Sequence, residues 1–104
     1  MELEDFFETS ILLQYYKNLL SEKQKKYMIE HFEEDYSLSE IANKYSISRQ
    51  AVYENIKRGI KVLYEYEEKL KFRNKEKRIK NELQKINNKY NIIELEEIIN
   101  EFSV

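Results

Sequence analysis

The chain has no proline and a single glycine, Gly59, among its 104 residues, so little in it interrupts a helix. Lys, Glu, Leu, Asn and Ile fill most positions, and of these Lys, Glu and Leu are strong helix formers. The length is that of one ordinary domain, large enough for a hydrophobic core. The sequence therefore predicts an all-α protein that folds as one unit, with room for a tail.

Serines mark the expected helix starts. Ser21 and Ser37 are each followed three residues later by a Gln or a Glu, which is the spacing of a capping box. Ser48 offers the same hydroxyl at the start of a fourth helix. We expect a first helix over about residues 2–20, a second from Ser21, a third from Ser37 to about Tyr45 and a fourth from Ser48.

The segment over residues 37–58 fits a helix-turn-helix unit. Two short, steeply crossed helices bury apolar or small side chains between them, and the matching residues are Ile41, Ala42, Ile47, Val52 and Ile56. The turn position that is often glycine is Ser46, where left-handed backbone costs a non-glycine residue about 1 kcal/mol. The second helix directs a polar face outward, with Arg49 and Gln50 in the turn that usually reaches deepest into the major groove.

The outward face of this second helix supplies the candidate site. The candidate DNA-binding residues are Ser48, Arg49, Gln50, Tyr53, Lys57, Arg58 and Lys61. The first four are expected to contact bases or nearby phosphates, and the last three to contact phosphates. Phosphate contacts fix the position of the protein on the duplex without reading its sequence. Two alternatives stay open. The segment could be three packed helices that bind no ligand, or the Tyr53 side chain could pack against the protein instead of contacting DNA. Glu54 is expected to pair with Arg58 rather than to contact a cytosine.

The first expected helix carries apolar side chains over more of its circumference than one buried face needs. They are Phe6, Phe7, Ile11, Leu12, Leu13, Tyr15, Tyr16, Leu19 and Leu20. Such a stripe contacts two surfaces, either because a partner subunit covers one of them or because the helix is central in a single small bundle. The sequence leaves both arrangements open.

A long C-terminal helix is expected beyond Gly59, the one plausible joint, either as a separate helix or as an unbroken continuation of the fourth helix. Apolar residues recur there with the a/d spacing of a coiled-coil seam, at Phe72, Ile79, Leu83, Ile86 and Tyr90. A helix over residues 60–90 would be about 45 Å long at about 1.5 Å per residue, longer than the preceding unit can cover. Asn residues around Tyr90 favour an interruption before a short amphipathic helix over residues 92–102, which either folds back on the long helix or does not.

Charge is separated along the chain although the formal net charge is −2. Residues 69–89 carry nine basic side chains against two acidic ones, whereas residues 1–10 and 94–101 each carry four acids and no base. The basic stretch is either the solvated face of a helix or a phosphate-binding surface for RNA. We expect a helix-turn-helix domain over residues 1–66 and a basic helical extension over residues 67–104 that serves dimerisation.

Several classes of function are excluded by what the sequence lacks. It has no cysteine and one histidine, His31, so no sulfur-ligated metal and no other metal site is expected. It has no glycine-rich phosphate loop and no set of nucleophile, base and orienting group, so neither a cofactor nor enzymatic activity is expected. The acidic amino terminus and the lack of an apolar run of about 18 residues favour a cytoplasmic protein without a membrane span.

Two stretches resemble the YlxM family of small helix-turn-helix proteins, whose genes lie beside those of the signal recognition particle. They are Glu34-Asp35-Tyr36-Ser37-Leu38 with Glu40-Ile41-Ala42, and Ser48-Arg49-Gln50-Ala51-Val52-Tyr53 with Asn55-Ile56 and Arg58. Residues 21–63 also look like the DNA-binding region 4 of sigma factors. The resemblance implies a sigma-like helix-turn-helix bundle that binds double-stranded DNA as a homodimer. It also implies a link to the signal recognition particle pathway, either through regulation or as a non-enzymatic accessory protein that binds the particle's GTPase or its RNA.

Overall fold

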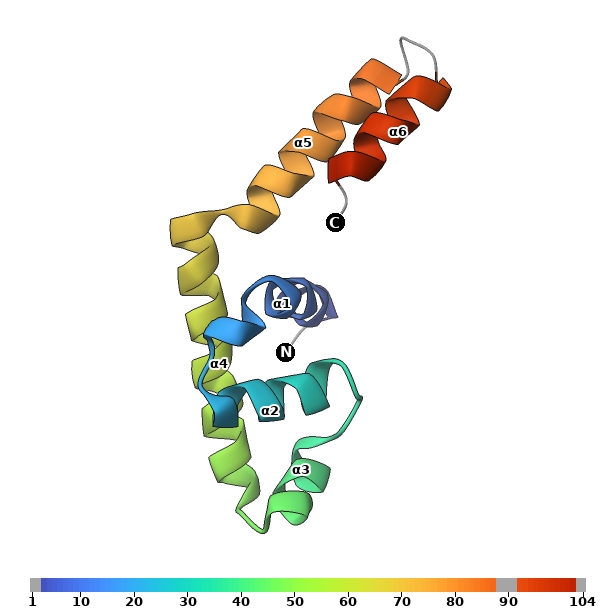
Figure 1. Ribbon diagram of the computed structural model, residues 1–104. Helices are drawn as coiled ribbons and strands as arrows, with labels where there is room; N and C mark the ends of the chain where they lie inside the picture. The colour runs from blue at the N-terminus through green and yellow to red at the C-terminus, as the bar shows by residue number, and fades with distance from the viewer. Residues whose placement is uncertain (1–2, 88–91, 103–104) are drawn as a thin grey trace. The chain divides into compact units, whose positions relative to one another are not determined.

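The computed structural model describes residues 3–87 and 92–102 (Figure 1). The helices are α1 (Leu3–Tyr16), α2 (Glu22–Phe32), α3 (Leu38–Tyr45), α4 (Arg49–Leu70), α5 (Phe72–Asn87) and α6 (Ile92–Phe102), with a short 3-10 helix η1 (Lys17–Leu19) after α1. No strand occurs among the described residues, and the predicted all-α class is confirmed. None of these helices combines the length and the apolar surface that a bilayer crossing requires. The chain divides into two compact units that meet in sequence at Lys71 and Phe72.

Serine side chains start three of these helices, as predicted. Ser21 Oγ accepts a hydrogen bond from Gln24 N at 3.2 Å, and Ser37 Oγ accepts one from Glu40 N at 3.1 Å. In both cases the side chain three residues on accepts in return from the serine N–H, which completes the capping box. Ser48 Oγ accepts from the N–H three residues later at 3.0 Å. The residue at which α4 begins is thereby fixed.

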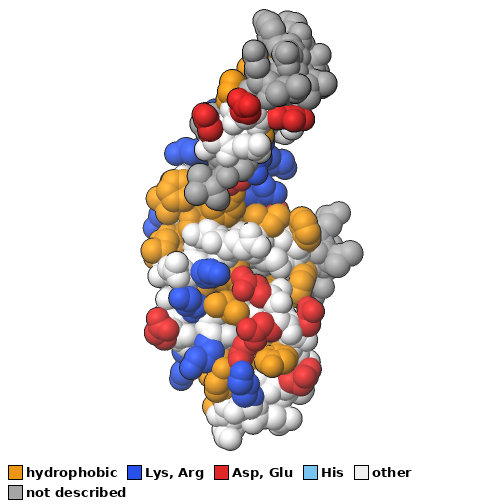
Figure 2. All heavy atoms as spheres, turned by 45° about the vertical axis from the view of Figure 1, so that its right-hand side comes forward, with side chains coloured by type: hydrophobic (Ala, Val, Ile, Leu, Met, Phe, Trp, Pro, Cys, Tyr) orange, Lys and Arg blue, Asp and Glu red, His pale blue; other side chains and the backbone are white. Residues whose placement is uncertain are grey.

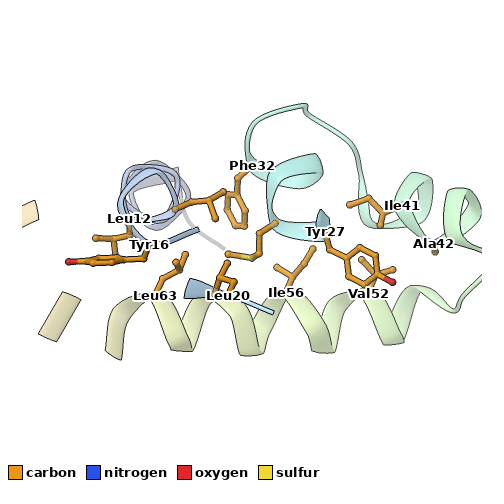
Figure 3. Packing of buried hydrophobic residues seen from close by; sticks show 12 residues of the cluster. Leu12, Tyr16, Leu20, Tyr27, Phe32, Ile41, Ala42, Val52, Ile56 and Leu63 are labelled. Carbon is orange, nitrogen blue, oxygen red and sulfur yellow. The ribbon is translucent and has the colours of Figure 1, made fainter. Parts of the chain in front are cut away.

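The core of the first unit lies where α4 packs against α1, α2 and α3 (Figure 3). Its buried hydrophobic side chains are Leu12, Leu13, Tyr16, Leu20, Tyr27, Met28, Phe32, Ile41, Ala42, Val52, Ile56 and Leu63. Val52, Ile56 and Leu63 recur along one side of α4, at intervals of four and seven residues, which directs them into the same core. One helix therefore serves as the common packing surface for the other three.

Helix α1 packs its wide apolar stripe inside the first unit. Leu12, Leu13 and Tyr16 are buried, and α1 contacts both α2 and α4. Tyr16 Oη donates to Glu67 Oε1 at 2.7 Å, which ties α1 to the second half of α4. Phe7 remains 67% exposed. Two neighbouring helices of the same unit thus account for the buried part of the stripe, which favours the small bundle over a partner subunit at α1.

The only glycine lies inside α4 and not at a joint. Gly59 is buried, and a Cβ there would lie 3.1 Å from both Cγ and Sδ of Met28. Glycine therefore lets α4 approach α2 closely. The predicted joint at Gly59 is wrong, because this close packing compensates for the roughly 1 kcal/mol that glycine costs relative to alanine within a helix.

The helix break falls instead at Lys71, which has left-handed backbone (φ 56°, ψ 30°). Its N–H donates to Glu67 O at 2.8 Å and closes the end of α4. Of the two arrangements that the sequence leaves open, the unbroken helix is therefore excluded, since α4 and α5 are separate helices. Residues 88–91, where the sequence predicts an interruption, lie outside the described residues.

The second unit is a pair of helices, α5 and α6, that contact each other. The short helix expected near the carboxyl end is present and folds back along α5 (Figure 1). The described side chains of this unit are those of residues 72–86 and 96–101, and none of them is buried. Among these side chains the second unit has no core of its own.

Candidate nucleic-acid interface

The helix-turn-helix is formed by α3, residues 46–48 and α4. Ser46 has left-handed backbone (φ 55°, ψ 44°), as predicted for the turn. The N–H groups of Ser46 and Ile47 donate to Asn43 O at 3.4 Å and to Ala42 O at 3.0 Å, which is the hydrogen-bond pattern of a Schellman motif. This motif ends α3 sharply and directs the chain into α4.

Small and apolar side chains join the two helices, as predicted. Ile41 and Ala42 of α3 are buried in the same core as Val52 and Ile56 of α4 (Figure 3). Ile47 is half-buried at the turn and packs against that core. Because these side chains occupy one side of α4, the other side of the helix is left to solvent.

All seven candidate DNA-binding residues are exposed, on α4 or at its cap. They are Ser48, Arg49, Gln50, Tyr53, Lys57, Arg58 and Lys61. At about 100° per residue, Gln50, Lys57 and Lys61 fall on the side of α4 opposite its buried residues. Arg49 lies in the first turn, where a recognition helix comes closest to base edges. Arg58 lies about half a turn round the helix from Arg49, so the two side chains face different directions.

Two side chains of this face are held by local hydrogen bonds. Gln50 Nε2 donates to Glu54 Oε1 at 2.9 Å, and Arg58 Nη2 donates to Asn55 Oδ1 at 3.5 Å. The predicted Glu54–Arg58 pair is therefore wrong, because each of its members bonds to another neighbour on the helix. Since the amide nitrogen carries two hydrogens, Gln50 keeps one N–H and its amide oxygen for the two hydrogen bonds that an adenine offers.

A hollow of about 460 Å³ opens beside this face, between α2, α3 and α4. Its lining residues are His31, Leu38, Tyr53, Ile56, Lys57 and Ile60. Tyr53 is 43% exposed while it lines the hollow, so its ring both packs and stays accessible. His31 Nδ1 lies 2.8 Å from Tyr36 O. In the part of the chain that the structure describes, no group of three or more His, Cys, Asp or Glu side chains is arranged to hold a metal ion.

Glu30, for which no role was predicted, is a buried carboxylate of α2 with 5% of its surface exposed. It accepts hydrogen bonds from Tyr45 Oη at 2.8 Å and from Lys44 Nζ. Both donors stand at the end of α3, so one carboxylate ties α2 to α3 directly before the turn. A signal for this was present, because Glu30 follows Tyr27 by three residues and so falls on the buried side of α2.

Both donors have raised pKa values. The hydrogen bond to Glu30 is the main cause of the raised pKa of Lys44. Burial is the main cause of the raised pKa of Tyr45, and the hydrogen bond to Glu30 adds to it. Lys44 Nζ also lies 5.3 Å from the centre of the Tyr36 ring, within the range of a cation–π contact. The end of α3 is thus fixed by charge as well as by packing.

The surface of the first unit is not uniformly basic. On the face that Figure 2 shows, Lys and Arg side chains are interspersed with Asp and Glu side chains. The formal net charge of the whole chain is −2. Attraction to a polyanion therefore has to come from local groups, such as Lys57 and Lys61, and not from the net charge.

Comparisons with known proteins show close relatives. A UPF0122 protein of Fusobacterium nucleatum subsp. nucleatum is 52% identical over 99 residues, which cover 95% of this chain and 96% of that protein. UPF0122 proteins of Lactococcus lactis subsp. cremoris and Bacillus velezensis are 51% and 50% identical over 70 residues. These two matches cover 67% of this chain but only 63% and 64% of the relatives, which is less than two thirds of their length.

The family match agrees with the helix-turn-helix geometry. The sequence model of the UPF0122 family matches residues 3–102, and its description reads "Putative helix-turn-helix protein, YlxM / p13 like". The matched range includes α3, the left-handed turn at Ser46 and α4. The resemblance to the YlxM family is thereby confirmed, and the chain belongs to the UPF0122 family of YlxM/p13-like helix-turn-helix proteins.

Proposed function

We propose that the chain is a DNA-binding regulator that reads a duplex with the start of α4. One observation carries the proposal: the second helix of a helix-turn-helix begins at a serine cap and exposes Arg49 and Gln50 in its first turn. Arg and Gln are residue types that form bidentate hydrogen bonds with guanine and adenine in the major groove. The description of the family as a helix-turn-helix family supports the same function.

Two kinds of contact are proposed for this face. Arg49, Gln50 and Tyr53 would contact base edges and so give specificity. The proposed phosphate contacts are Ser48, Lys57, Arg58 and Lys61. Their exposure on α4 supports this assignment, because each side chain can reach a duplex without unfolding any part of the core.

We further propose that the chain acts as a homodimer. Two copies related by a two-fold axis would place their recognition helices in successive major grooves, with half-sites about 34 Å apart. A dimer also doubles the number of phosphate contacts, which strengthens binding and steepens its salt dependence. A regulator with a net negative charge gains most from that doubling.

Fluorescence anisotropy with genomic DNA fragments tests the proposal, first to select a bound site and then to compare variants. Arg49→Ala and Gln50→Ala should lose discrimination between that site and a scrambled duplex. Lys57→Ala should weaken binding to both duplexes equally and lower the slope of the salt dependence by about one unit. Lys23→Ala removes the same charge from an exposed position of α2 and should bind like the parent. The proposal fails if Arg49→Ala and Lys57→Ala also bind like the parent.

A second candidate is a non-enzymatic accessory role in the signal recognition particle pathway, through the particle's RNA or its GTPase. It is favoured by α5, which carries six basic side chains against two acidic ones and exposes Lys75, Lys77 and Arg78. A basic helix can follow a phosphate backbone without reading bases. Capture of the purified particle RNA or GTPase should survive Arg49→Ala and be lost when Lys77, Arg78 and Lys80 are changed to Ala. Specific binding to duplex DNA with neither particle component captured would reject this candidate.

A further inference from the structure

The second unit leaves apolar side chains in water. Ile79 and Ile86 of α5 and Ile98 of α6 are 42%, 41% and 40% exposed. Helices of 16 and 11 residues are near or below the length at which an isolated helix is stable in water. A segment of fewer than about 40 residues seldom buries enough surface to fold alone. A stable α5–α6 pair therefore needs another surface to cover its isoleucines.

A hollow of about 420 Å³ lies on α5 around Ile79. Its lining residues, among those described, are Lys75, Arg78, Ile79, Glu82 and Leu83. The first four stand at positions i, i+3, i+4 and i+7, which is the four-residue hole that receives one side chain of a packed partner helix in a coiled coil. The spacing therefore points to a helix as the occupant.

Charge indicates which helix fits. The hollow is lined by two basic side chains, Lys75 and Arg78, and by Glu82, whose carboxylate pairs with Lys85 at 3.2 Å, on a helix with six basic and two acidic side chains. The other helix of the unit, α6, has the opposite character, with four glutamates and no base. Exposed Ile98 lies there between exposed Glu97 and Glu101. An α6 from another molecule thus offers an apolar side chain with acids beside it, which complements the hollow.

We infer that the exposed face of the α5–α6 pair is covered by the same face of a second copy of this chain, with Ile98 of each copy in the Ile79 hollow of the other. Each copy carries both the hollow and the side chain that fills it, so the contact forms twice and closes into a two-fold dimer. The inference rests on the proposed function, in which the chain acts as a homodimer, and it names the surface through which the two copies meet. It assigns the dimer contact to a unit that does not contain the recognition helix.

Sedimentation equilibrium of the full chain without DNA tests the contact. The parent should be a dimer at micromolar concentration. Ile79→Glu and Ile98→Glu should each raise the dissociation constant at least about a hundredfold, because a carboxylate would be left in an apolar contact. Tyr64→Glu places the same charge at an exposed aromatic side chain of α4 and should remain dimeric. A monomeric parent overturns the inference, and so do isoleucine variants that stay dimeric.

Charge-swap variants distinguish a loss of this contact between the two copies from a loss of folding. Lys75→Glu with Arg78→Glu gives an acidic hollow, and Glu97→Lys with Glu101→Lys places two bases beside Ile98, with α6 as a whole neutral. Each double variant should be monomeric alone, since its hollow and the residues beside the incoming Ile98 carry like charges. An equimolar mixture should form a heterodimer, because every hollow then meets an Ile98 flanked by opposite charges. Lys77→Glu lies on α5 outside the hollow and should stay dimeric.

A mixture that stays monomeric, while both double variants keep the helical circular dichroism of the parent, overturns the inference. If a double variant loses that signal, the isoleucine variants decide instead. None of these measurements contains DNA, so a dimer found in them stands even if DNA binding fails. Conversely, a monomeric chain that discriminates DNA through Arg49 would reject the dimer contact and leave the reading role of α4 in place.

Discussion

The two compact units are both built from amphipathic helices, but the apolar faces of these helices are buried to different extents in the two units. In the first unit α1, α2 and α3 all pack on α4, and the apolar faces meet in one core. In the second unit α5 packs on α6, and none of the described side chains is buried. Each helix of the second unit has one partner within that unit, whereas α4 has three. The comparison shows that a helix-forming sequence is not sufficient for burial.

Removal of core volume from the first unit should give the largest loss of stability. Leu63 is fully buried on α4, and Leu63→Ala should lower the free energy of unfolding by about 2–5 kcal/mol, through lost burial and the cavity left behind. Ile86→Ala, the matched truncation in the second unit, should change the unfolding of the first unit by less than about 0.5 kcal/mol at a concentration where the chain is monomeric. Urea unfolding followed by circular dichroism measures both variants. Equal losses would contradict a core confined to the first unit.

A larger side chain at the close contact between α2 and α4 should lower the free energy of unfolding somewhat less. Gly59→Leu should lower the free energy of unfolding by about 1–3 kcal/mol, because the new side chain has to displace Met28. Gly59→Ala should be nearly neutral, since a gain in helix propensity of about 1 kcal/mol offsets a Cβ that meets only the flexible Met28 side chain. Asn81→Leu, at an exposed position of α5, should leave this transition unchanged. If Gly59→Ala costs as much as Gly59→Leu, Met28 cannot move aside.

Loss of the cap on α4 should lower the free energy of unfolding by about 1 kcal/mol. Ser48→Ala removes the hydroxyl that accepts the Ala51 N–H at 3.0 Å, and so leaves a backbone donor of α4 without its partner. Ser39→Ala, at an exposed position within α3, is the matched control and should not destabilise, because alanine is the better helix former. Thermal unfolding compares the two variants. Identical midpoints would mean that water replaces the cap.

The smallest effect should appear in alkaline solution. The pKa of Lys44 is raised mainly by its hydrogen bond to Glu30, and the pKa of Tyr45 is raised mainly by burial. The folded state keeps these protons where the unfolded chain releases them, so their contribution is full below about pH 10 and is lost as the pH rises further. As the pH rises above about 10, the free energy of unfolding of a Lys44→Met, Tyr45→Phe double variant should fall less steeply than that of the parent. Urea midpoints at several alkaline pH values measure this, and parallel slopes would contradict it. The half-exposed Lys44 keeps the effect small through solvent screening.

Local patterns predicted much of the first unit. The caps at Ser21, Ser37 and Ser48 and the left-handed turn at Ser46 each depend on residues only a few positions apart, and the structure confirms all four. The outward placement of Gln50 and Lys57 follows from the helical period in the same way. Contact with DNA stays a prediction, because exposure of a polar face does not by itself identify a ligand.

Contacts between helices account for what the local patterns missed. Gly59 looked like a joint because glycine weakens an isolated helix, but the neighbouring Met28 makes a small residue favourable there. Lys71 carries no sequence sign of a break, since lysine is an ordinary helix former, yet its backbone is left-handed. The helical period places Glu30 on the buried side of α2, but the hydrogen bonds that satisfy its carboxylate come from Lys44 and Tyr45 of another helix. Such effects depend on which helices meet.

Arg49 and Gln50 stand outside the core, and the hydroxyl of Ser48 holds the start of the helix without their help. Exchange of either residue would leave folding almost untouched, so the proposed reading surface can evolve while the scaffold stays constant. Under the proposed function, a lineage that carries this fold could acquire new target sequences through a few surface substitutions, with no compensating change in its interior.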